Sequence, residues 1–166
     1  MKLGLRILLL AMIWVVTSPV FAGTPQGAST PPASDAIEYR NTRFGFVFSL
    51  PQGWKGYTIV TEQWEASDAQ KGSVESGPVV CIRHPDWTKE SPRQDIPIMV
   101  FTLGQWDSAE KGNLYVGGVA ISPGELGRNR KYAFAVSRRV EDSDVAGAKE
   151  VNGILQHSPL RPLWSK

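Results

Sequence analysis

Three side chains in one short stretch are of types that bind metal ions: His84, Asp86 and Glu90. A catalytic zinc site typically uses about three protein ligands of such types. His84 and Asp86, which a single proline separates, supply half of such a site at best. We therefore interpret His84 as a structural or surface histidine and predict no metal ion and no other cofactor. A small envelope hydrolase or metal-dependent enzyme that uses these three residues is the alternative.

The candidate nucleophiles are weak. Cys81 lies within an apolar segment that is typical of a strand, where burial raises the pKa of a thiol and makes it inert. Ser122 stands in a sequence similar to a nucleophile elbow, but Pro123 follows it and has no N–H for an oxyanion hole. Asp142 opens a pattern similar to a calcium loop, yet Gly153 occupies the position of its final carboxylate. We predict no catalytic residues.

Five cations bracket one predicted strand, residues 132–136. Three precede it and two follow it: Arg128, Arg130, Lys131, Arg138 and Arg139. They are either the solvated ends of an ordinary strand or a surface that attracts an acidic protein or an anionic envelope component. The salt dependence of binding distinguishes the two interpretations, because salt screens exposed charges.

One tryptophan is a candidate anchor for a partner. Trp87 sits in a polar segment between His84 and Glu90. Exposed tryptophan is a common anchor in protein interfaces. The other interpretation is that Trp87 covers the edge of the core.

The elements that position these residues are mostly strands. Phe44, Phe46, Phe48 and Leu50 alternate with smaller residues, which places four large side chains on one sheet face. Further strands are predicted over 57–64, 79–82, 96–101 and 132–136, with a long polar loop over 65–77. Two helices are predicted: one over 102–111 that opens with a capping box, and one with Asp144 as its N-cap. This order predicts an α+β fold, an antiparallel β-sheet flanked by helices.

The first predicted strand also carries a family resemblance. Tyr39 is followed by Phe44-Gly45-Phe46, Phe48, Leu50-Pro51 and Gly53-Trp54. This pattern resembles the opening hairpin of PsbP-like domains, which are named for an extrinsic subunit of the photosynthetic oxygen-evolving complex. The resemblance implies an α/β/α sandwich and a role in binding other proteins. It transfers no functional residue to this chain.

The first 22 residues predict a signal peptide. Lys2 and Arg6 precede an apolar run over 7–16, and Ala22 precedes the expected cut. Residues 23–36 are rich in proline, glycine, serine and threonine and are expected to form a disordered linker. Residues 37–166 are then expected to form a single globular domain, which the resemblance implies is PsbP-like. The sequence predicts a periplasmic or secreted protein without a membrane anchor after cleavage.

Composition narrows the function further. Without Lys2 and Arg6 the chain has equal numbers of acidic and basic side chains, which argues against a nucleic-acid partner. The single cysteine excludes an internal disulfide. We therefore expect an exported, non-catalytic binding module whose partner the sequence does not identify.

Overall fold

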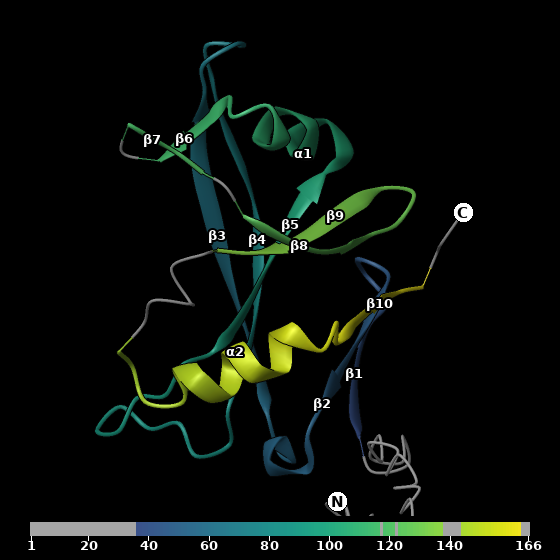
Figure 1. Ribbon diagram of the computed structural model, residues 1–166, viewed down its shortest axis with the longest axis vertical. Helices are drawn as coiled ribbons and strands as arrows, with labels where there is room; N and C mark the ends of the chain where they lie inside the picture. Colours follow the sequence, from purple (N-terminus) through teal and green to yellow (C-terminus); the bar gives the residue numbers. More distant parts are fainter. Residues whose placement is uncertain (1–35, 117, 122, 138–143, 164–166) are drawn as a thin grey trace, which may run out of the picture. The chain divides into compact units, whose positions relative to one another are not determined.

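The computed structural model describes residues 36–116, 118–121, 123–137 and 144–163. The predicted signal peptide, and the predicted linker except for Ala36, lie outside these ranges. Within them the chain forms two helices, a 3-10 turn and ten strands (Figure 1). The helices are α1 (Leu103–Glu110) and α2 (Ala148–Gln156), and neither is long and apolar enough to cross a membrane. The strands are β1 (Ile37–Asn41), β2 (Phe46–Leu50), β3 (Thr58–Asp68), β4 (Ser73–Arg83), β5 (Ile96–Thr102), β6 (Leu114–Val116), β7 (Val119–Ala120), β8 (Gly124–Arg128), β9 (Tyr132–Val136) and β10 (Leu160–Pro162).

The opening hairpin belongs to a small antiparallel sheet with the order β1-β2-β10. β1 pairs with β2 so that Tyr39 lies opposite Phe48, and β10 pairs with the other edge of β2. The predicted aromatic stripe is confirmed, because Phe46, Phe48 and Leu50 are at most 1% exposed and share one core. Phe44 joins this core from the turn before β2 rather than from the strand.

The other strands form an antiparallel sheet with the order β7-β6-β3-β4-β5-β9-β8. Alternate residues of β4 enter different cores, because successive strand residues point to opposite faces. Val80 and Ile82 pack in the core that contains Val151 of α2, whereas Val79 and Cys81 pack in the core that α1 covers. The two helices therefore lie on opposite faces of the large sheet, and the α+β prediction is confirmed at this level.

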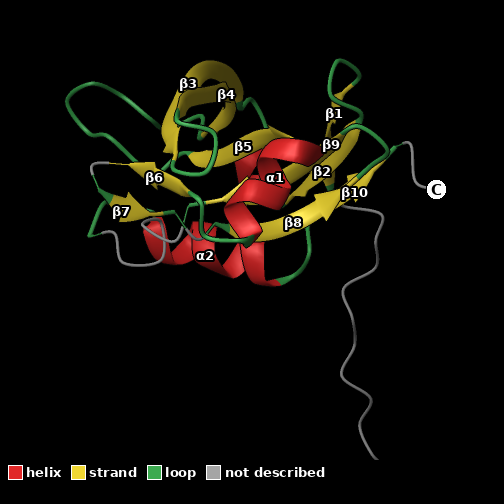
Figure 2. Ribbon diagram, turned by 90° about the horizontal axis from the view of Figure 1, so that it is seen from above, coloured by secondary structure: helices red, strands yellow, loops and turns green. Residues whose placement is uncertain are grey.

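Strands as well as a helix cover one of these faces. The rings of Phe46 in β2 and Phe134 in β9 meet with their centroids 4.9 Å apart, and Leu160 of β10 joins the same core. The small sheet thus packs against the large one (Figure 2). The prediction of one sheet flanked by helices missed this second sheet. The two sheets are separate because none of β1, β2 and β10 pairs with a described strand of the large sheet.

The prediction of a long loop over residues 65–77 is wrong. β3 and β4 are both eleven residues long and pair along their whole length. The segment has a polar sequence because one face of this hairpin is exposed. On the other face Trp64, Ala66 and Asp68 alternate into the protein.

The two helices begin in different ways. α1 opens with the predicted capping box: Thr102 Oγ1 accepts the Gln105 N–H at 3.3 Å, and Gln105 Oε1 accepts the Thr102 N–H at 2.9 Å. The N-cap of α2 is Gly147, not Asp144 as predicted, and it makes no side-chain cap. The chain enters α2 through a turn that the Ala148 N–H closes, and Gly147 has a φ of 85°, which glycine adopts without strain.

Candidate functional site

The β8–β9 turn carries the described part of the predicted cationic surface. Arg128 ends β8, and Arg130 and Lys131 lie in the turn before β9. All three side chains are exposed. Within the described ranges neither Arg130 nor Lys131 forms an ion pair, so both charges are open to solvent. Arg138 and Arg139, the other two predicted cations, lie outside the described residues.

One buried side chain fixes this turn. Asn129 is 6% exposed, and its Oδ1 accepts the backbone N–H groups of Lys131 and Tyr132, each at 2.9 Å. Its Nδ2 donates to the carbonyl oxygens of Phe44 at 2.8 Å and Gly45 at 3.1 Å. Asn129 therefore pins the β8–β9 turn to the β1–β2 turn, which lies beside it in Figure 1.

The β1–β2 turn brings a further cation, Arg43, which the sequence analysis did not single out. The guanidinium carbon of Arg43 lies 5.1 Å from the centroid of the Phe44 ring, and that ring meets Tyr132 edge-on at 5.6 Å. Arg43 is exposed and has no ion pair with any described residue. Arg43, Arg130 and Lys131 thus project from two turns that are held together, and we call these three residues the cationic end.

Arg128 is engaged within the protein. It donates to Glu125 from Nε at 2.8 Å and from Nη2 at 2.6 Å, and Nη2 also reaches Glu110 of α1 at 3.2 Å. The hydrogen bonds from Arg128 lower the pKa of Glu125, and those carboxylates raise the pKa of Arg128. Because two carboxylates already match its charge, Arg128 connects β8 to α1 and adds little attraction for an external anion.

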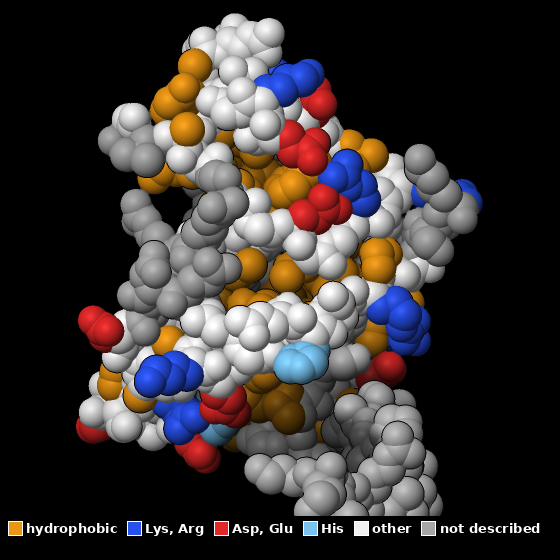
Figure 3. Space-filling view, viewed as in Figure 1, with side chains coloured by type: hydrophobic (Ala, Val, Ile, Leu, Met, Phe, Trp, Pro, Cys, Tyr) orange, Lys and Arg blue, Asp and Glu red, His pale blue; other side chains and the backbone are white. Residues whose placement is uncertain are grey.

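A hollow of about 600 Å³ lies between α1 and the β8–β9 turn, within the usual size range of ligand sites. The residues of α1 that line it are Leu103, Trp106, Asp107 and Glu110. The residues on the strand side are Arg128, Asn129 and Arg130. Figure 3 shows acidic and basic side chains around an apolar patch at the level of α1. Through Arg130 the hollow adjoins the cationic end.

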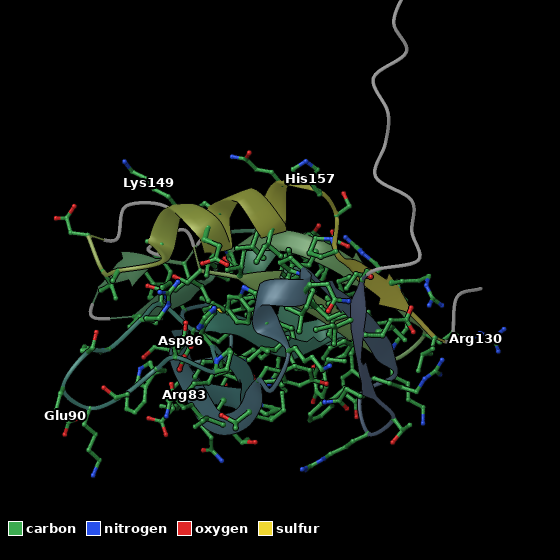
Figure 4. The ribbon with its side chains drawn as sticks, turned by 90° about the horizontal axis from the view of Figure 1, so that it is seen from below. Arg83, Asp86, Glu90, Arg130, Lys149 and His157 are labelled. Atoms are coloured by element: carbon green, nitrogen blue, oxygen red, sulfur yellow. The ribbon has the colours of Figure 1, made fainter. Side chains whose placement is uncertain are left out.

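Trp87 lies in the loop between β4 and β5 and is half-buried. The Arg83 guanidinium covers its ring, with 4.0 Å between the guanidinium carbon and the ring centroid. Asp95 holds Arg83 in place by accepting from Nε at 3.1 Å and from Nη2 at 2.8 Å. Figure 4 shows Glu90, on the same loop, far from Arg130. Trp87 and the cationic end are therefore separate surfaces.

The structure brings two of the three candidate metal ligands together, because His84 Nδ1 lies 3.7 Å from Asp86 Oδ2, but Glu90 does not join them. The His84 ring is 6% exposed, packs edge-on against Trp54 at 4.9 Å and accepts the Asp86 N–H at 3.1 Å through Nδ1. Glu90 lies at the outer part of the loop, away from Asp86 (Figure 4). Among the described residues no group of three or more His, Cys, Asp or Glu side chains is placed to hold a metal ion. Of the two positions that the sequence analysis left open for His84, structural or surface, its burial against Trp54 fits the structural one.

Cys81 is buried in the core beneath α1, as its apolar neighbours predicted. Burial is the main cause that raises the pKa of its thiol to about 12, and the nearby Glu62 carboxylate adds to the effect. At neutral pH the side chain is therefore an unreactive thiol. Ser122 and Asp142, which the sequence analysis weighed and set aside, lie outside the described residues.

Comparison of the chain with protein-family models, with curated proteins and with solved structures finds no match.

Proposed function

We propose that this chain is an exported, non-catalytic binding module that presents the cationic end to an acidic protein or an anionic envelope component. The observation that carries the proposal is the set of three exposed cations from two turns, none of them ion-paired within the described residues. Exposed cations without an ion pair among the described residues also occur singly elsewhere, as at Lys55 and Lys89, but these three come from two turns that Asn129 joins. Asn129 holds the cationic end in place, which reduces the entropy lost when a partner binds.

Export and family membership belong to the same proposal. The sequence of residues 1–22 supports export to the periplasm or the medium. The opening hairpin, and an antiparallel sheet with a helix on each face, support a PsbP-like domain and the α/β/α arrangement that this resemblance implies. A binding role agrees with that resemblance, although a fold alone assigns no activity.

The test is retention of the mature protein on isolated envelope material at low and moderate salt. The variant Arg43→Glu/Arg130→Glu/Lys131→Glu reverses the cationic end. We expect the unchanged protein to be retained at low salt and released as salt rises, because the Debye length falls to about 8 Å at physiological ionic strength. We expect the variant to be lost from the material at both salt concentrations.

A matched variant controls for net charge. Lys55, Lys89 and Lys149 are exposed cations away from the two turns of the cationic end, and their reversal to Glu changes the total charge by the same amount. This control should be retained like the unchanged protein. Equal retention of both variants, each folded by circular dichroism, would show that the cationic end is ordinary solvated surface.

A further inference from the structure

We infer that the partner is a protein, and that it binds through an acidic segment that places one large apolar side chain in the hollow beside α1. This inference rests on the proposed function and specifies the partner. It follows from the position of the hollow, which shares Arg130 with the cationic end. A single bound segment can therefore reach the cations and the hollow together.

The first argument is the apolar wall. Leu103 is 39% exposed although it is a large hydrophobic residue, and it lines the hollow with Trp106. An anionic polymer without apolar groups would leave this surface in contact with water. Interface anchors are typically large side chains that fill such desolvated pockets next to polar contacts.

The second argument is the balance of charge around the hollow. Asp107 is paired with Lys111 at 2.6 Å, and Glu110 is paired with Arg128 at 3.2 Å. Arg130 is the lining charge that has no ion pair among the described residues. Because Arg128 is shared by Glu110 and Glu125, the charges around the hollow balance. The attraction for acidic residues therefore comes from Arg130 together with Arg43 and Lys131 of the cationic end.

The experiment compares three probes on the full mature chain. Two are synthetic peptides with a central Trp or a central Ala in an otherwise identical acidic sequence, and the third is inorganic polyphosphate. We expect the Trp peptide to bind about tenfold more tightly than the Ala peptide, the usual effect of an anchor side chain. Leu103→Ala should remove most of that difference and leave polyphosphate binding unchanged. Alanine suits a helix, so α1 should persist in this variant.

Val74→Ala is the matched control, because Val74 is exposed on the β3–β4 hairpin and does not line the hollow. It should preserve the preference for the Trp peptide. Equal binding of the two peptides, or a preference that survives Leu103→Ala, would overturn the inference. If only the inference fails, the unchanged protein should still be retained on envelope material at low salt. If the unchanged protein is not retained and binds none of the three probes, the proposed function itself is overturned.

Discussion

The indole Nε1 of Trp64 in β3 donates a hydrogen bond at 3.0 Å to the backbone carbonyl of Val100 in β5, two strands away. The indole lies over Gly77 of β4, where an added Cβ would come within 2.6 Å of Nε1. Continuing the β4–β5 register by one residue places Pro78 opposite Val100, and proline has no amide hydrogen to donate. Trp64 therefore supplies the donor that Pro78 lacks.

Trp64→Phe tests this relationship. The variant keeps an aromatic ring but removes the N–H, so the buried Val100 carbonyl loses its donor. We expect the free energy of unfolding to fall by about 1–3 kcal/mol, measured by chemical denaturation. Trp106→Phe is the comparison, because its Nε1 has no acceptor among the described residues. If the two variants lose the same stability, the Trp64 hydrogen bond has no special role.

Phe46→Ala tests the core between the two sheets. Phe46 is fully buried and contacts the rings of Tyr39 and Phe134, at 5.8 Å and 4.9 Å between centroids. We expect a loss of about 3–5 kcal/mol in the free energy of unfolding, because the substitution leaves a cavity. Ser49→Ala, at an exposed position of the same strand, should change stability by less than about 0.5 kcal/mol. A melting temperature that hardly moves in Phe46→Ala would contradict this packing.

The Cys81 thiol should resist chemical modification in the folded protein. Its pKa is raised from 9.0 to about 12, which lowers the thiolate fraction at neutral pH by about a thousandfold. We expect a thiol reagent to label Cys81 rapidly in denaturant and only very slowly without it. Equally fast labelling of the folded protein, followed by absorbance, would contradict the buried position.

The stability of the protein should fall in acid, partly through Asp68. Hydrogen bonds to its carboxylate hold the pKa of Asp68 below its ordinary value of 3.8, and the bond from the Lys71 backbone N–H has the largest effect. The charged carboxylate thus favours the folded state above that value, and the benefit is lost as the pH falls through the lowered pKa. Asp68→Asn should make the protein less stable at neutral pH and flatten its decline in acid. Denaturation curves from pH 6 to about pH 2 measure both effects, and an unchanged slope would exclude this role.

Processing of the chain tests the export proposal. Mass spectrometry of the exported protein should find an N-terminus at or near Gly23. Ala22→Tyr, which places a bulky residue before the expected cut, should slow cleavage. A membrane-bound product that retains Met1 would contradict a cleaved signal.

Local patterns predicted the elements that neighbouring residues specify. The alternation from Phe46 to Leu50 and the capping box of Thr102 and Gln105 each depend on a few consecutive residues, and the structure contains both. The N-cap of α2 was missed because a turn that ends at Gly147 replaced the side-chain cap expected of Asp144. The long β3–β4 hairpin was missed because its exposed face has the composition of a loop.

The candidate site was only partly predictable for a related reason. Arg130 and Lys131 stood out in the sequence as members of a set of five cations on either side of one predicted strand. Arg43 lies near them because Asn129 forms a hydrogen bond to Phe44, the residue after Arg43. Asn129 and Phe44 are 85 residues apart in the sequence, and no local pattern encodes such a contact. The hollow likewise depends on how α1 packs beside the β8–β9 turn.

The hydrogen bonds by which Asn129 joins the two turns also link partner binding to folding. Arg43 and Arg130 come together only when the first and last thirds of the domain have both reached their native places, so an unfolded chain offers the same charges merely as a dispersed set. A partner specific for the assembled surface binds the native state alone. At a hundred times its dissociation constant such a partner would add about 2.7 kcal/mol to the stability of the domain. By mass action the partner would therefore bind only correctly folded molecules and would protect them from unfolding.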